Sequence, residues 1–135
     1  MQLIAGNPTA EEFSNLRQAV GWGAPTTAQI EQAFSRTALA VRIEKDGRLC
    51  AFGRLVSDGM LCTYFQDIMV RPDLQRQGLG SAVVRALQEA APEPIPGGFR
   101  GLIAIPGTEP FYERLGFHEQ VPQNTVMVLE QELRS

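Results

Sequence analysis

The residues best suited to chemistry lie where an apolar strand runs into a glycine-bearing turn and then into an amphipathic helix. The strand is expected over Tyr64–Val70, the turn contains Gly78 and Gly80, and Pro92 ends the helix. The first four amides of a helix have no acceptor within the helix, and the helix dipole makes this end positive. Glycines here let a ligand approach the backbone closely. The stretch therefore predicts an anion site of the kind that binds phosphate groups.

The spacing of the glycines separates this turn from two other phosphate-binding loops. A Walker loop has Lys and then Ser or Thr after its last glycine, whereas this chain has Ser81-Ala82. A dinucleotide-binding loop has a longer glycine spacing and a later acidic residue on a second strand, and neither is evident. The remaining pattern, Gln75-x-x-Gly78-x-Gly80, resembles motif A of the GNAT superfamily of acyl-CoA N-acyltransferases.

A second stretch, Phe111 to Phe117, reads Phe-Tyr-Glu-Arg-Leu-Gly-Phe and resembles motif B of the same superfamily. Thr108 is placed to cap its helix, and Gly116 supplies the left-handed residue that ends it. The two motifs and the elements between them cover the chain from about Ala38 to Phe117. The resemblance implies a single N-acetyltransferase domain over residues 1–135.

The resemblance also implies that acetyl-CoA is the co-substrate. In GNAT folds the sheet splays after the motif A strand, and the pantetheine arm pairs with backbone of that strand, here Ile68, Met69 and Val70. The other implied cofactor-binding residues surround the pyrophosphate and are Gln75, Arg76, Gln77, Gly78, Leu79, Gly80 and Ser81. Many bacterial members carry an asparagine before motif B that contacts CoA. This chain has Ile105-Pro106-Gly107 there, so that contact is missing.

Two residues are candidates for catalysis of acetyl transfer to an amine. The reaction needs a proton acceptor for the attacking nitrogen and a donor for the leaving thiolate. Tyr112 matches the family tyrosine that donates to the CoA sulfur, although a tyrosine here could also pack in the core. Asp67 is the candidate base and matches an acidic position of glucosamine-phosphate acetyltransferases, where the preceding residue, here Gln66, is acidic too. The alternative base is an ordered water, which would leave Asp67 with a structural role.

The order of elements predicts an α/β (α+β) fold: a GNAT-like mixed, mostly antiparallel, splayed sheet flanked by about four helices. The first two helices should begin after the caps Thr9 and Thr26. Trp22 lies in the glycine-rich joint between them and could either fill the core or border the acceptor site. The predicted strands are Met1–Ala5, Ala38–Lys45, Arg48–Ser57, Leu61–Val70, Phe99–Ile105, Phe117–Gln120 and Thr125–Leu129, the last two flanking a turn at Pro122-Gln123-Asn124.

The two cysteines, Cys50 and Cys62, are expected to be free thiols. Asp46-Gly47 and Asp58-Gly59 predict two-residue hairpin turns, and counting outwards from the second turn places Cys50 opposite Asp67. The cysteines would then be about 16 Å apart at the rise of a strand, beyond the roughly 7 Å between Cα atoms that a disulfide allows.

Composition excludes several classes of protein. A net charge of −3 argues against a nucleic-acid partner, which would favour a basic excess. No apolar run approaches the roughly 20 residues of a membrane span, and the N-terminus lacks the features of an export signal, so we expect a cytoplasmic protein without a membrane partner. His118 is the single histidine and has no cluster of ligands near it in sequence, so no metal site is predicted.

These inferences converge on an N-acetyltransferase that passes an acetyl group from acetyl-CoA directly to a primary amine in a ternary complex. The alternative is a catalytically idle acyl-CoA-binding module with a sensory or regulatory role, which would need motif A but not Tyr112. The acceptor, whether a small molecule or a peptide amine, carries no motif in the sequence. A homodimer is compatible with the resemblance, because members of the superfamily often pair.

Overall fold

The structure is a computed structural model, and it describes residues 1–120 and 124–129 of the chain. The chain divides into two compact units, Met1–Ile103 and Ala104–Ser135, which we describe separately. The first unit contains, in order, β1 (Gln2–Ala5), α1 (Ala10–Ala19), α2 (Thr27–Ser35), β2 (Leu39–Lys45), β3 (Arg48–Ser57), β4 (Cys62–Val70), a short 3₁₀ turn η1 (Pro72–Leu74), α3 (Leu79–Ala90) and β5 (Phe99–Gly101). In the second unit the described helix is α4 (Glu109–Glu113).

The first unit is built on a five-stranded sheet in the order β1-β2-β3-β4-β5. All neighbours are antiparallel except β4 and β5, which confirms the mixed, mostly antiparallel sheet. β5 pairs with β4 only from Cys62 to Tyr64, and Gln66–Val70 continues beyond the end of that ladder. The sheet therefore splays as expected. The predicted strand Phe99–Ile105 is too long, because its pairing with β4 ends at Gly101.

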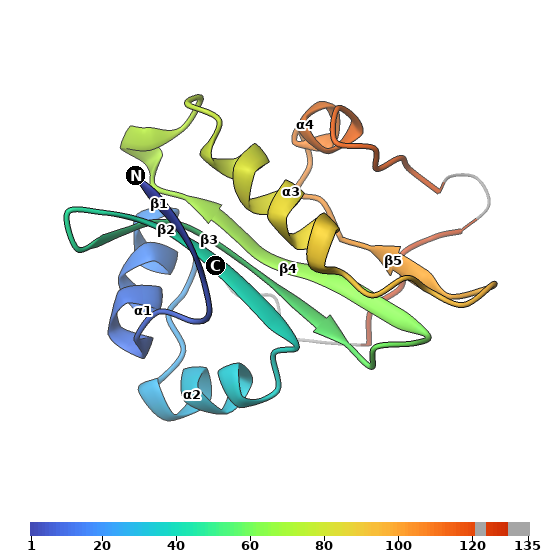
Figure 1. Ribbon diagram of the computed structural model, residues 1–135, viewed down its shortest axis with the longest axis horizontal. Helices are drawn as coiled ribbons and strands as arrows, with labels where there is room; N and C mark the ends of the chain where they lie inside the picture. The colour runs from blue at the N-terminus through green and yellow to red at the C-terminus, as the bar shows by residue number, and fades with distance from the viewer. Residues whose placement is uncertain (121–123, 130–135) are drawn as a thin grey trace. The chain divides into compact units, whose positions relative to one another are not determined.

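Helices cover both faces of this sheet: α3 lies on one face, and α1 and α2 lie on the other (Figure 1). The alternation of side chains along β3 explains the two layers. The ring of Phe52 meets that of Phe13 on α1 at a centroid distance of 5.3 Å. Its neighbour Gly53 faces Val83 and Leu87 of α3. The α1–α2 side of the core contains Phe13, Leu16, Ile30, Ala40, Leu49, Phe52 and Met69, with Trp22 packed at its margin.

The first two helices begin where the sequence predicts. Thr9 and Thr26 each form a capping box, in which the side chain accepts from the third helical amide and the third side chain accepts from the cap amide. Both helices bury one apolar face against the sheet, through Phe13 and Leu16 in α1 and Ile30 in α2. Among the described residues, none of the helices has both the length and the apolar character needed to cross a bilayer.

One of the two predicted hairpin turns is wrong. Asp46-Gly47 is a two-residue turn with both φ angles positive, as predicted. The second turn is longer, because Ser57 pairs with Thr63 rather than with Met60. The carboxylate of Asp58 accepts hydrogen bonds from the amides of Met60, Leu61 and Cys62, and these bonds stabilise the wider loop. The same bonds, that from Met60 first, hold the pKa of Asp58 below its usual range.

The wider loop changes the register but not the conclusion about the cysteines. Cys50 lies opposite Arg71, whose amide donates to its carbonyl oxygen, rather than opposite Asp67. It is therefore farther from Cys62 along β4 than predicted. Both cysteines are free thiols, which confirms the expectation.

The two predicted closing strands are also wrong in the described residues. Neither residues 117–120 nor residues 124–129 take part in a β-ladder. Val126 to Leu129 are all strongly exposed, so the apolar pattern that suggested a strand has no buried face there. Two residues of the turn predicted between them, Pro122 and Gln123, lie outside the described residues.

The close packing of α3 on β3 predicts that Gly53→Ala destabilises the protein. A Cβ at Gly53 would lie 2.7 Å from Val83 Cγ1 and 2.9 Å from Leu87 Cδ1, so these buried side chains or the helix that carries them must shift. We expect a loss of about 1–3 kcal/mol in the free energy of unfolding, measured with urea. Gly23→Ala is the matched control, because its Cβ would meet nothing within 4 Å, and it should change stability by less than about 0.5 kcal/mol. Equal stability of the two variants would contradict this packing.

Candidate active site

The predicted anion site is a turn that leads from β4 into α3. After Val70 the chain forms η1, extends at Gln75 and takes positive φ angles at Arg76 and Gly78. Gly78, at φ +82°, is the N-cap of α3. The side chain of Gln75 donates to the carbonyl oxygen of Val70 over 3.2 Å and so closes the turn on the strand.

The start of α3 differs from the starts of α1 and α2 in having no side-chain cap. Gly78 has no side-chain oxygen that could accept from the first amides of the helix. In the described part of the chain, no other acceptor is seen for the amides of residues 78–81. The exposed Arg76 and the half-buried Arg71 add positive charge close by. Free amides at the positive end of a helix, on an exposed turn, are suited to hold phosphate oxygens.

β4 carries a β-bulge, at which two residues of β4 lie opposite one residue of β3. Phe52 pairs with Met69 but Arg54 pairs with Gln66, so Asp67 and Ile68 together oppose Gly53. Asp67 has φ +55°, in the left-handed region that non-glycine residues seldom adopt. The bulge lies beyond the end of the β5 ladder, where the sheet has already splayed.

Among the described residues, no strand pairs with this edge of β4 beyond Tyr64, so the splay leaves the edge open for pairing. Arg71 donates to Cys50, and because hydrogen-bonded positions alternate along an antiparallel ladder, the backbone groups of Met69 turn toward β3. Those of Ile68 and Val70 then turn toward the open edge. The side chain of Met69 is buried in the core. Of the three strand residues in the predicted cofactor site, Ile68 and Val70 have their backbone on the open side.

The carboxylate of Asp67 lies between two guanidinium groups. Its Oδ1 accepts from Arg17 Nη1 of α1 at 3.1 Å, and its Oδ2 accepts from Arg54 Nε of β3 at 2.6 Å. The three side chains are only 14–22% exposed, so the pairs are shielded from solvent. Charge-assisted hydrogen bonds of this kind are stronger than neutral ones. The cluster connects α1, β3 and β4 at the bulge.

Each arginine of the cluster is itself held in place. Arg17 donates to the carbonyl oxygen of Gly23 at 2.7 Å, and its guanidinium carbon lies 5.4 Å from the ring centroid of Trp22. Arg54 donates to the hydroxyl of Thr37 at 3.1 Å. Trp22 therefore packs at the margin of the core, one of the two roles weighed from the sequence, and its ring also contacts a charged residue.

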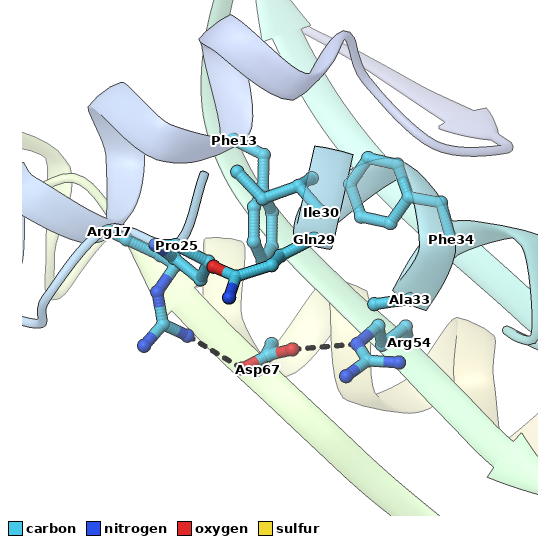
Figure 2. A pocket seen from close by; sticks show the side chains of 9 residues that line it. All are labelled: Phe13, Arg17, Pro25, Gln29, Ile30, Ala33, Phe34, Arg54 and Asp67. Carbon is cyan, nitrogen blue, oxygen red and sulfur yellow. Dashed lines mark hydrogen bonds and ion pairs between the residues drawn. The ribbon is translucent and has the colours of Figure 1, made fainter. Parts of the chain in front are cut away.

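The cluster forms the polar floor of a pocket of about 220 Å³ beneath α1 and α2. Figure 2 shows Asp67 between Arg17 and Arg54, with apolar side chains of the two helices above them. The lining residues are Phe13, Arg17, Pro25, Gln29, Ile30, Ala33, Phe34, Arg54 and Asp67. The volume is smaller than the roughly 300–1,000 Å³ of pockets for drug-sized ligands, so the pocket suits a small molecule or one group of a larger one.

In the second unit, Tyr112 lies on α4 and packs against Phe111 and Phe117, with ring centroids 4.9 Å and 5.8 Å away. Gly116 takes φ +96° and ends the helix as predicted. Burial raises the pKa of the Tyr112 phenol above its ordinary value of 10.0. The hydroxyl therefore stays protonated, and able to donate, throughout the neutral range.

A model of the acetyltransferase (GNAT) family matches residues 9–117, which include both motifs and every element of the site described above. The chain belongs to the GNAT acetyltransferase family. The match begins before α1 and so includes the pocket as well as the turn, and it continues across the boundary between the two units.

Curated relatives and solved structures agree with this membership. The GCN5-related N-acetyltransferase 1 of Arabidopsis thaliana, named as chloroplastic, is 37% identical over 81 residues, which are 58% of this chain and 41% of that protein. The uncharacterized N-acetyltransferase ycf52 of Porphyra purpurea is 27% identical over 114 residues, 78% of this chain and 63% of that protein. The chain thus spans less than two thirds of the length of these relatives.

The fold is shared with experimental structures of similar length. A probable acetyltransferase from meticillin-resistant Staphylococcus aureus superposes with a TM-score of 0.86 at 22% identity, over 96% of this chain and 98% of that one. A GNAT family protein from Streptococcus pneumoniae gives 0.80 at 25% identity, over 98% of each chain. A more distant neighbour, AAC(6')-Iy in complex with a CoA-containing bisubstrate analogue, gives 0.68 at 14% identity over 98% of this chain and 100% of that one.

The structure brings some predicted site residues together and adds others. Asp67 and Ile68 form the bulge, and Ile68 and Val70, on either side of Met69, have their backbone at the open edge. The residues from Gln75 to Ser81 form the uncapped turn. Tyr112 lies in the other unit. Sequence reasoning missed Arg17 and Arg54. A signal was available for Arg54, because an arginine inside the otherwise apolar strand 49–56 needs a partner when it is buried.

The shielded cluster predicts that Asp67→Asn destabilises the protein by about 2 kcal/mol, because two partly buried guanidiniums lose their shared counter-charge. Urea unfolding would measure this loss. Asp73→Asn is the matched control: Asp73 pairs with Arg48 at 3.8 Å, and both side chains are more than half exposed. Its cost should stay below about 0.5 kcal/mol. Equal costs for the two variants would show that the cluster is not a structural anchor.

Proposed function

We propose that this protein is an N-acetyltransferase that moves an acetyl group from acetyl-CoA directly to a primary amine. The observation that carries the proposal is the uncapped start of α3, which follows a strand with one open edge inside the region matched by the family. Phosphate oxygens need free amides, and a pantetheine arm needs an unpaired strand edge. The chain offers the open edge at the end of β4 and the free amides at the start of α3, about ten residues apart in sequence.

In the proposed complex the pyrophosphate accepts from the amides of the turn, with the residues from Gln75 to Ser81 around it. The pantetheine amides pair with the open edge of β4 at Ile68 and Val70, while Met69 supports that edge from the core. The thioester then lies close to the bulge. This arrangement uses backbone groups and so depends little on side-chain identity, apart from the need for glycine at Gly78.

Transfer requires the amine nitrogen to bond to the thioester carbonyl carbon while the carbon–sulfur bond breaks. The departing thiolate takes a proton, and the nitrogen loses one. We assign the donor to Tyr112, whose raised pKa keeps its hydroxyl protonated. For the nitrogen, the proposed acceptor is Asp67 or a water ordered beside it. Both oxygens of Asp67 already accept from guanidiniums, which favours the water and an anchoring role for Asp67.

The competing proposal is an idle acyl-CoA-binding module. The pocket of Arg17, Arg54 and Asp67 favours the enzyme, because a sensor of acyl-CoA alone needs no second polar pocket beside the bulge. We further propose that the two units form one N-acetyltransferase domain, since the family match runs through both. From the sequence we also propose that the protein works in the cytoplasm. Release of free CoA thiol across a panel of amines would test the enzymatic proposal.

The proposed phosphate site predicts that Gly78→Val abolishes binding of acetyl-CoA, measured by calorimetry. A branched side chain would cover the amides that phosphate must reach, and it would also strain the positive φ. Gly59→Val is the matched control for strain, because Gly59 has φ +80° and open space around it but lies in the β3–β4 loop. It should lose similar stability and keep its affinity. Unchanged binding by a folded Gly78→Val protein would refute the site.

The proposed acid predicts that Tyr112→Phe lowers kcat by about 10²-fold with little change in the dissociation constant of CoA. A hydrogen bond to the sulfur strengthens only as negative charge develops there, so ground-state binding does not need it. Tyr64→Phe is the control, because Tyr64 is the only other tyrosine and its exposed ring packs on Phe99. If Tyr112→Phe turns over several amines as fast as the parent, Tyr112 is a packing residue and another group supplies the proton.

A further inference from the structure

The charges in the pocket beneath α1 and α2 do not cancel. Arg17 and Arg54 contribute two positive charges and Asp67 one negative charge, while the six other lining residues are neutral. The floor of the pocket is therefore left with one positive charge. This local excess contrasts with the chain as a whole, which has a net charge of −3.

The hydrogen-bonding groups of the pocket show the same bias. Arg17 uses Nε and Nη1, and Arg54 also uses Nε and Nη1, so each guanidinium keeps its Nη2 without a bond among the described residues. Gln29 gives its Oε1 to the amide of Thr26, which leaves its Nε2 as a further donor. Both oxygens of Asp67 are already engaged. The pocket thus offers donors to a ligand, and its one carboxylate is already shared by two cations.

The upper wall is apolar. Phe13, Ile30 and Phe34 form it together with Pro25 and Ala33, and Phe13 and Phe34 pack edge to face with centroids 5.0 Å apart (Figure 2). Phe13 and Ile30 of the wall belong to the buried core, and Phe34 packs against it, so helix packing fixes most of the wall. A ligand for this pocket therefore combines an anionic group with a small apolar or weakly polar body.

We propose that the acceptor is a small primary amine that carries a carboxylate or a phosphate, and that Arg17, Arg54 and Gln29 bind this anionic group. The inference rests on the proposed function. Asp67 directly precedes Ile68, whose backbone faces the open edge of β4. An acceptor anchored by its anion beside Asp67 is thereby held next to the strand that receives the pantetheine arm, with its amine free to reach the thioester.

Polycationic amines fit the same pocket poorly. Each added positive charge would meet two guanidiniums, and the one carboxylate that pairs with them among the described residues already bonds to both. Like charges a few ångströms apart in a partly buried site repel each other, so we expect each added positive charge on an acceptor to lower its kcat/KM.

The test compares matched amines by kcat/KM, measured as CoA thiol released from acetyl-CoA. In the carboxylate arm, phenylalanine is compared with phenylalanine amide. In the phosphate arm, 2-aminoethyl phosphate is compared with ethanolamine. Spermidine represents the polycationic amines. We expect the anionic member of at least one pair to exceed its neutral partner by about tenfold or more, and spermidine to be the poorest acceptor. The arm that shows the difference identifies the anion. The preference should weaken as salt is raised from low concentration to 0.5 M.

A single-atom change tests the assignment of the site. Gln29→Glu keeps an oxygen for the capping box with Thr26 but replaces the Nε2 donor with a negative charge in the pocket. It should lower kcat/KM for the preferred anionic amine by about tenfold and reduce the difference between the matched partners. Gln32→Glu adds the same charge to an exposed position of the same helix, outside the pocket, and should leave the preference intact. Calorimetry with acetyl-CoA should give parental affinity for both variants.

The outcomes separate this inference from the proposed function. If kcat/KM for neutral amines or for spermidine equals that for anionic amines, the inference is overturned, whereas the proposed N-acetyltransferase activity is supported. Equal effects of Gln29→Glu and Gln32→Glu would also overturn it. If acetyl-CoA binds but no amine in any arm releases CoA, the proposed function fails and the inference falls with it.

Discussion

The ion-pair cluster centred on Asp67 is the constraint on which the rest of the site depends. Its two oxygens connect Arg17 of α1 to Arg54 of β3 across the bulge of β4. Helix α1 is thereby fixed against the sheet by polar bonds as well as by the aromatic packing of Phe13 on Phe52. Because a partly buried carboxylate is costly without partners, the bulge, the helix and both arginines must occur together.

The bulge serves the backbone as well as the side chains. It turns Asp67 toward the helices, while the following residues continue β4 with one edge paired to β3 and the other open. An open strand edge usually invites aggregation, but here it is short and lies within a splay between β4 and β5. The uncapped start of α3 lies just beyond its end. One irregular strand thus presents both the edge that we propose for the acyl donor and the face that we propose for the acceptor.

The two parts of the site differ in how much they constrain the sequence. The proposed donor site relies on amides and carbonyl groups, so many side chains would satisfy it, and glycine matters most at Gly78, where φ is +82°. The pocket proposed for the acceptor relies on the identities of Arg17, Arg54 and Gln29 and on the shape of an apolar wall. Because the turn before α3 does not depend on α1 and α2, the side chains of these two helices can differ without disturbing it. Proteins with the same fold can therefore share one reaction and differ in their acceptors.

The sequence by itself determined the features whose bonds are local. The caps at Thr9 and Thr26, the turn at Asp46-Gly47 and the glycine-bearing start of α3 are set by residues within four positions of one another, and their patterns were readable. Family membership followed from two such patterns. Even a local feature was missed where a single carboxylate, that of Asp58, stabilises a wider loop than its neighbours suggest.

Only the tertiary structure decided the pocket that we propose for the acceptor. Arg17 and Asp67 are 50 residues apart, and Arg54 and Asp67 are 13 apart. Whether they meet depends on the register of β3 and β4, and one residue of slippage changes the face on which a side chain lies. The bulge opposite Gly53 introduces that slippage at the site itself. Long-range register is set by the packing of whole faces, so no short motif in the chain could specify it.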